Sequence, residues 1–94
     1  MFKITRGQGF HITFSNGYTV SVQFGPMSYC DHYFQKDVNE FSSEECGKLG
    51  STTAECAVIM DDDLIETPFF EGDTVKGWMS PEEVLELLNW AAKQ

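Results

Sequence analysis

Residues 10–24 read FHITFSNGYTVSVQF, and the fold can be inferred outward from this pattern. Apolar and polar side chains alternate on both sides of a central Ser-Asn-Gly, which is typical of two half-buried strands joined by a tight turn. The register follows from the alternation, because residues directly opposite each other share a face of the sheet. A two-residue turn at Asn16-Gly17 would place Phe14 opposite Thr19, an apolar residue against a polar one.

A three-residue loop at 15–17 pairs Phe14 with Tyr18 instead. All the alternating apolar side chains then share one face; they are Phe10, Ile12, Phe14, Tyr18, Val20 and Val22. The same loop places Gly17 at the left-handed position of a type I turn with a G1 bulge. We expect this register, because a slip by one residue would expose the hydrophobic set.

Shorter strands are predicted around this hairpin. Residues 2–5 and residues 54–60 alternate in the same way, and each predicts a strand. The run of three aspartates at 61–63 predicts a turn. Residues 64–70 predict a further strand that ends near Pro68, a residue found in sheets only at an edge. Residues 27–52 are the least regular, with a short helical turn predicted at 42–45.

The clearest element outside the hairpin is a helix that begins at Ser80. Ser80 is the expected N-cap, Pro81 occupies the first helical position, and Glu83 completes a capping box. Met79 and Val84 occupy the two positions of a hydrophobic staple.

The predicted helix is amphipathic. Its apolar stripe is widened by Leu85 and should cover the apolar face of the sheet, whereas Trp90 should face away; the stripe consists of Val84, Leu87, Leu88 and Ala91. The sequence therefore predicts one α+β domain over residues 1–94: a small antiparallel sheet, formed by the N-terminal hairpin and two or more further strands, covered by a C-terminal helix.

Length and composition favour a cytoplasmic protein with no membrane contact. Ninety-four residues suit one domain. No stretch approaches the ~20 apolar residues of a membrane span, and the first residues lack the apolar segment of a signal peptide. The three cysteines, Cys30, Cys46 and Cys56, are an odd number that fits reduced thiols and not a disulfide framework.

The net charge of −9 is concentrated in the C-terminal half. Residues 1–30 contain Lys3 and Arg6 and no acid, whereas residues 57–94 contain nine acids against two lysines. Such a surface repels phosphate backbones, so direct binding of nucleic acid is disfavoured. It can instead meet a basic protein surface, with solubility as the competing explanation.

The candidate partner-binding residues are the acids of segment 61–73, two glutamates on the outer side of the predicted helix and one aromatic residue before it. They are Asp61, Asp62, Asp63, Glu66, Glu71, Asp73, Glu82, Glu86 and Trp78. An exposed aromatic side chain rimmed by acid suits a protein–protein contact or a pocket that stacks a base.

Metal or thiol chemistry finds little support. Residues 30–32 read CDH and, with Cys46 and Cys56, offer thiols and an imidazole, but there is no Cys-x-x-Cys pair and Cys56 falls on the apolar face of a predicted strand. The cysteine and histidine of 30–32 are only two residues apart, whereas a nucleophile and its base usually come from distant segments. The second histidine, His11, is predicted on a solvent-exposed strand face.

Two further motifs are incomplete. The aspartates at 61–63 with Glu66 lack the spaced ligands and central glycine of an EF-hand loop. Residues 7–9 read GQG without the lysine and helix of a phosphate-binding loop. We therefore expect no cofactor, no metal and no catalytic residue.

Four strings resemble a family of short uncharacterised proteins from tailed phages and bacterial genomes: NGYTVSVQFG at 16–25, YCD at 29–31, TAECAV at 53–58 and GWMSPEEV at 77–84. The resemblance is weakest over residues 34–49, and it carries over no catalytic residue. It implies a setting, because small phage proteins often bind and block a host machine. Some of these inhibitors are acidic and imitate nucleic acid, and others sequester nucleotide signals.

The sequence and this resemblance together predict a non-enzymatic acidic binding protein, a phage-encoded inhibitor of a host nucleic-acid-directed or defence protein with a basic surface. The alternative is an oligomeric small-ligand binder that sequesters a nucleotide in an aromatic-lined pocket. A metal- or thiol-dependent enzyme is the least supported interpretation. The dependence of binding on salt distinguishes the first two interpretations, because the association of an acidic with a basic protein surface weakens steeply with ionic strength.

Overall fold

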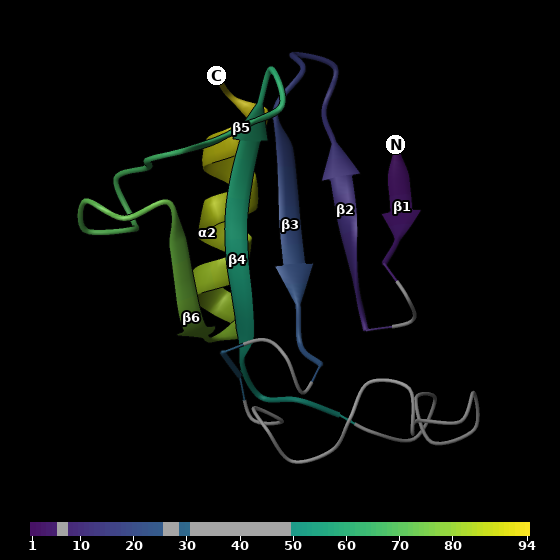
Figure 1. The fold of residues 1–94 in the computed structure, drawn as a ribbon, viewed down its shortest axis with the longest axis vertical. Helices are drawn as coiled ribbons and strands as arrows, with labels where there is room; N and C mark the ends of the chain where they lie inside the picture. Colours follow the sequence, from purple (N-terminus) through teal and green to yellow (C-terminus); the bar gives the residue numbers. More distant parts are fainter. Residues whose placement is uncertain (6–7, 26–28, 31–49) are drawn as a thin grey trace.

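A computed structural model of the protein describes residues 1–5, 8–25, 29–30 and 50–94. These residues form an antiparallel sheet with one helix packed on one of its faces, so the predicted α+β fold is confirmed (Figure 1). The elements are β1 (Phe2–Ile4), β2 (Gly9–Thr13), β3 (Thr19–Gln23), β4 (Ala54–Met60), β5 (Asp63–Ile65), β6 (Val75–Met79) and α2 (Pro81–Ala92).

The predicted hairpin register is confirmed. Phe10 lies opposite Val22 and Ile12 opposite Val20. The backbone N–H of Phe14 donates to the carbonyl of Tyr18 at 2.9 Å, which closes the three-residue loop. Gly17 has a φ of +91°, the left-handed conformation that this loop requires.

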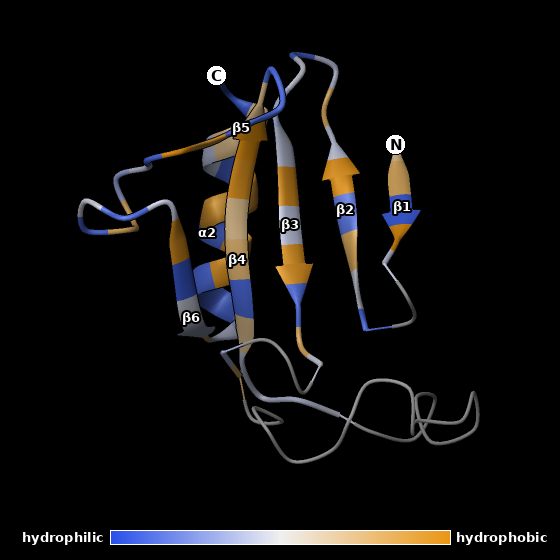
Figure 2. Cartoon of the chain, in the orientation of Figure 1, coloured by the Kyte–Doolittle hydropathy of each residue, from blue (hydrophilic) through white to orange (hydrophobic). Residues whose placement is uncertain are grey.

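Strand β4 extends the apolar face of the hairpin. Val58 lies opposite Val20 and Cys56 opposite Val22, so all four side chains point to the helix side. Hydropathy alternates along β2 and β3, whereas β4 is apolar from Cys56 to Met60 (Figure 2). Helix α2 closes this face, and the buried core cluster consists of Val20, Val22, Ala54, Cys56, Val58, Phe70, Met79, Leu87 and Ala91.

Strands β5 and β6 share the far side of β4. Strand β5 pairs with the Met60 end of β4 and β6 with its Ala54 end, and segment 66–74 separates them. The strand predicted over 64–70 is therefore wrong beyond Ile65, and β6 was not predicted at all. The chain leaves the sheet after Ile65, and Pro68, three residues further on, could not donate a ladder hydrogen bond.

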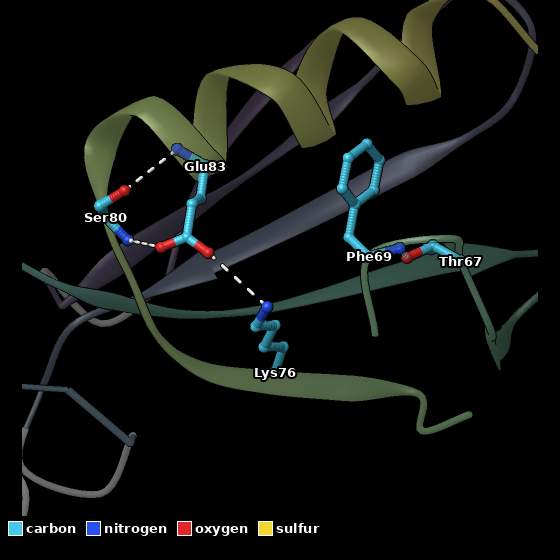
Figure 3. A network of polar contacts seen from close by, with 5 residues as sticks. All are labelled: Thr67, Phe69, Lys76, Ser80 and Glu83. Atoms are coloured by element: carbon cyan, nitrogen blue, oxygen red, sulfur yellow. Dashed lines mark hydrogen bonds and ion pairs between the residues drawn. The ribbon is translucent and has the colours of Figure 1, made fainter. Parts of the chain in front are cut away.

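The start of α2 is confirmed in atomic detail (Figure 3). The backbone N–H of Glu83 donates to Ser80 Oγ at 3.2 Å, and the backbone N–H of Ser80 donates to Glu83 Oε1 at 3.0 Å. Pro81 occupies the first turn, where the helix has no use for its missing N–H.

Two expectations about the faces of α2 are wrong. Leu85 is 58% exposed, so it does not join the core. Trp90 does not face away but is half-buried, with edge-on ring contacts to Tyr18 and Phe69 at centroid distances of 6.0 and 6.4 Å. The flank of α2 that carries Trp90 meets segment 66–74, a neighbour that helical periodicity alone could not reveal.

No helix in the described parts of the chain is both long and apolar enough to cross a membrane. The helical turn predicted at 42–45 lies outside the described residues.

Candidate functional site

Two large aromatic side chains stack on the surface of the protein. Tyr29 and Trp78 have ring centroids 5.3 Å apart and planes 25° from parallel. Their side chains remain 45% and 56% exposed. Aromatic residues dominate the energetics of protein interfaces, so an exposed stacked pair is a candidate contact site.

A bulge in β6 places Trp78 at this position. Lys76 lies opposite Cys56 and Met79 opposite Ala54, so two residues of β6 face the single residue Glu55. Trp78 has a φ of +50°, a left-handed conformation that is unfavourable for a bulky residue. Such strain persists where the surroundings enforce it, and it is concentrated at functional sites.

Tyr29 enforces the conformation of the bulge. The backbone N–H of Trp78 donates to the carbonyl of Tyr29 at 2.7 Å, and the backbone N–H of Tyr29 donates to Glu55 Oε2 at 3.1 Å. A Cβ atom added at Gly77 would collide with the Cβ of Tyr29, so only glycine allows this approach. We call Tyr29, Glu55, Gly77 and Trp78 the aromatic site.

The aromatic site lies at one end of the sheet face that α2 leaves open. Glu55 stands between the buried Ala54 and Cys56 and points away from the helix. The rest of this face is largely polar, and its side chains bond one another: Gln23 Nε2 donates to Ser21 Oγ at 3.2 Å and Thr5 Oγ1 donates to Gln23 Oε1 at 2.9 Å. Tyr29 and Trp78 therefore stand at the end of a polar sheet surface.

The three aspartates at 61–63 connect β4 to β5. Asp61 and Asp62 have φ values of 53° and 66° and form a two-residue turn, because Met60 pairs directly with Asp63. The predicted turn is thus one residue shorter, and Asp63 begins β5. Aspartate tolerates the left-handed conformation better than most residues, which suits this primed type of hairpin turn.

The predicted binding residues fall into separate groups. Asp61, Asp62 and Asp63 lie at the Met60 end of β4, roughly 20 Å along the strand from its Ala54 end. Glu66, Glu71 and Asp73 are exposed on segment 66–74.

Only Glu82 and Glu86, both exposed on α2, belong to the element that begins at the Trp78 end of the sheet. The structure therefore does not assemble all the predicted residues into one face.

The ion pair seen within the described residues joins Lys76 Nζ and Glu83 Oε2 at 3.6 Å (Figure 3). A hydrogen bond from the backbone of Ser80, with smaller contributions that include Lys76, holds the pKa of Glu83 below its usual value. The acids of 61–73 make no ion pair with the described residues, so a partner would meet their charge unneutralised.

The two described cysteines are buried among hydrophobic residues. Burial raises the pKa of the Cys56 thiol to about 12, and Glu55 adds to the shift. Cys30 Sγ donates to the carbonyl of Gly25 at 3.4 Å. A buried, protonated thiol is a poor nucleophile and a poor metal ligand.

Within the described ranges, no group of three or more His, Cys, Asp and Glu side chains is placed to hold a metal ion. His11 is half-buried, although the sequence predicted it exposed. Asp31, His32 and Cys46 lie outside the described residues.

Sequence reasoning selected Trp78 but missed Tyr29, Glu55 and Gly77 as its supports. The signal available was the Gly-Trp pair beside a strand, because glycine within a strand often marks a bulge or a close approach. Comparisons with protein-family models, curated proteins and solved structures found no match.

Proposed function

We propose that this protein is a non-enzymatic binding protein that docks on a basic surface of a protein partner through Trp78 and Tyr29. The observation that carries the proposal is the exposed stack of these two rings on a strained bulge beside Glu55. Strain of this kind costs stability, and a contact made by the strained residue gives a reason for keeping it.

The chemistry of the aromatic site suits an arginine or lysine of the partner. A cation is attracted to the face of an indole or phenol ring, and the guanidinium of arginine stacks on such rings. The carboxylate of Glu55 supplies the opposite charge next to the rings. An arginine could contact ring and carboxylate together, which is the pattern of an interface hot spot.

The charge of the whole chain supports the same partner. A net charge of −9 attracts a basic surface over long range and raises the association rate at low salt. We further propose the setting implied by the sequence resemblance, in which the chain is a phage protein that acts in the host cytoplasm and blocks a host nucleic-acid-directed or defence protein.

Sequestration of a nucleotide is the second candidate, since a base could stack on the same rings. The charge of the described residues near the rings disfavours it. Glu55 borders the rings, and Lys76, a described base on β6, pairs with Glu83 and not with the aromatic site. A phosphate at this position would meet negative charge first.

The test is capture of partners from a bacterial lysate on immobilised protein, in low and in high salt. Trp78→Ala should lose the proteins that the wild type retains. Leu64→Ala should keep them, because Leu64 is a comparably exposed apolar residue elsewhere on the molecule, at 50%. The same proteins retained by Trp78→Ala would overturn the proposal, and a nucleotide released on denaturing the purified protein would favour sequestration.

A charge variant tests the electrostatic part separately. Replacing Asp62, Asp63, Glu66 and Glu71 with Asn or Gln removes exposed charge and keeps shape, so the fold should survive. Association with a captured partner should slow while dissociation changes little. Unchanged association kinetics would assign these acids to solubility.

A further inference from the structure

The helix covers only half of the sheet face on which it packs. Helix α2 contacts β3 and β4, and β1 and β2 extend beyond it (Figure 1). Phe2 lies opposite Ile12 and Ile4 opposite Phe10, so these four side chains point to the helix side. Phe10 and Ile12 pack against the edge of the core, whereas no described helix lies over Phe2 and Ile4. Phe2 is 74% and Ile4 78% exposed.

The flank of α2 facing this uncovered strip is also apolar. Leu85, at 58% exposure, and Leu88 line a hollow of about 260 Å³ together with Phe10 and Phe24. The hollow itself reaches β2 but not β1. The exposed Phe2 and Ile4 adjoin it through Phe10, which lies opposite Ile4, so we take β1 and β2 as the floor of a groove whose wall is α2. We define the apolar groove by Phe2, Ile4, Phe10, Phe24, Leu85 and Leu88.

The groove has the width of one helix. Two strands about 4.8 Å apart give a floor roughly 10 Å wide, which is close to the diameter of an α-helix with side chains. A helix lying beside α2 could thus continue the helical layer over the rest of the sheet. A contiguous exposed apolar surface of this kind usually marks an interaction site.

We propose that the apolar groove binds an amphipathic helix of a partner protein, with lysine or arginine on the polar face of that helix. The charge on α2, which forms the wall of the groove, indicates a basic partner. Glu82 is exposed three residues before Leu85 and thus near it on the surface of α2, so the polar side of an incoming helix would lie next to this carboxylate. The net charge of −9 favours a basic partner in the same way.

A second copy of the chain fits the groove less well. The helix that it could offer is α2, whose exposed side carries Glu82 and Glu86, and two such helices side by side would place acid against acid. The groove is on the opposite face of the sheet from Glu55 and the aromatic site, so this proposal stands independently of the function proposed above.

The probe is a fluorescein-labelled amphipathic peptide of leucine and lysine, about five helical turns long, with leucine at helical spacing. A scrambled peptide of the same composition is its control. The wild-type protein should bind the periodic peptide at least about tenfold more tightly than the scrambled one, because only a continuous apolar stripe fills a groove.

Matched variants locate the binding surface. Leu85→Glu in the wall and Ile4→Glu in the floor should weaken peptide binding about tenfold or more. Leu64→Glu adds the same charge at a comparably exposed apolar residue outside the groove and should leave binding unchanged. Circular dichroism should show each variant folded, since all these side chains are exposed.

Equal binding by Leu85→Glu, Ile4→Glu and the wild type would overturn the proposal, as would equal binding of the scrambled peptide. Analytical ultracentrifugation tests whether a second copy of the chain occupies the groove, because it measures the oligomeric state. A wild-type dimer that Leu85→Glu converts to a monomer, without loss at Leu64→Glu, would show that a second copy fills the groove and would also overturn the proposal.

Discussion

The side-chain amide of Asn16 donates hydrogen bonds to the carbonyl oxygens of Ala91 at 2.8 Å and Gln94 at 3.0 Å. The turn of the hairpin therefore caps the C-terminal end of α2. The last turn of this helix has no basic residue, and its C-cap, Lys93, is not left-handed. Asn16 adds side-chain donors to carbonyls at the end of the helix, and Ala91 O also accepts the backbone N–H of Gln94 at 3.4 Å.

Replacing Asn16 with Asp tests this cap. Aspartate keeps the acceptor that receives the backbone N–H of Tyr18 and suits the turn equally well. It replaces the donor amide with a carboxylate that faces two carbonyls, so the free energy of unfolding should fall by about 1–3 kcal/mol. Urea denaturation measures the loss. Ser15→Asp adds the same charge at an exposed neighbour and should change little; equal stability of both variants would contradict the cap.

Gly17→Val should destabilise the hairpin by at least about 1–2 kcal/mol, because a β-branched residue is poorly tolerated at a φ of +91°. The loss would come from the backbone, since a Cβ at Gly17 would lie at an ordinary 3.5 Å from Met60 Cε. Gly50→Val is the control, at an exposed glycine with open space around a Cβ. A thermal unfolding midpoint unaffected by Gly17→Val would mean that the turn is more tolerant than its geometry implies.

The elements that the sequence predicted well are those whose cause is local. The hairpin register follows from alternation within residues 10–24, and the start of α2 follows from side chains three residues apart, Ser80 and Glu83. Strand β6 was missed because its bulge at Gly77 and Trp78 breaks the alternation that reveals a strand.

The candidate site was only partly predictable for the same reason. Trp78 stood out by type, but its stacking on Tyr29 depends on a contact across 49 positions of sequence. The exposure of Leu85 depends equally on which strands the helix covers, because α2 lies on β3 and β4. Charge counted along the sequence suggested one acidic face, whereas turns and strands separate those acids in space.

The capping box makes stability depend on pH. Because the pKa of Glu83 is lowered by folding, its contribution is present above the ordinary glutamate value of 4.5 and is lost as the pH falls through the lowered value. At neutral pH, Glu83→Gln should melt at a lower temperature than Glu86→Gln, an exposed neutralisation on the same helix. The difference between the two melting temperatures should shrink in acid. A gap independent of pH would show that the ionised carboxylate is not the stabilising form.

The thiol of Cys56 should be inert in the folded protein. With a pKa of about 12, only about 10⁻⁵ of it is ionised at pH 7, and its side chain is 1% exposed. N-ethylmaleimide should label it only after unfolding in urea, and peptide mapping by mass spectrometry distinguishes it from Cys30 and Cys46. Labelling of Cys56 in the native protein, at the rate seen in urea, would contradict its burial.

Trp78 provides the sharpest test of strain at the aromatic site. Glycine adopts a φ of +50° without penalty, so Trp78→Gly should be more stable than Trp78→Ala by about 1 kcal/mol, although both remove the stack. Lys76 in the same strand has no left-handed backbone, and there the order should reverse, with the alanine variant more stable than the glycine variant. Urea denaturation of the four variants measures both differences.

Suppose that Trp78→Gly is more stable than Trp78→Ala and that both variants lose partner binding. This result would show that the protein tolerates backbone strain in order to present the indole ring. Alanine as stable as glycine would instead mean that the bulge relaxes once the indole is gone. In that case Trp78 would stabilise its own conformation through the stack with Tyr29, and the positive φ would no longer point to a binding role.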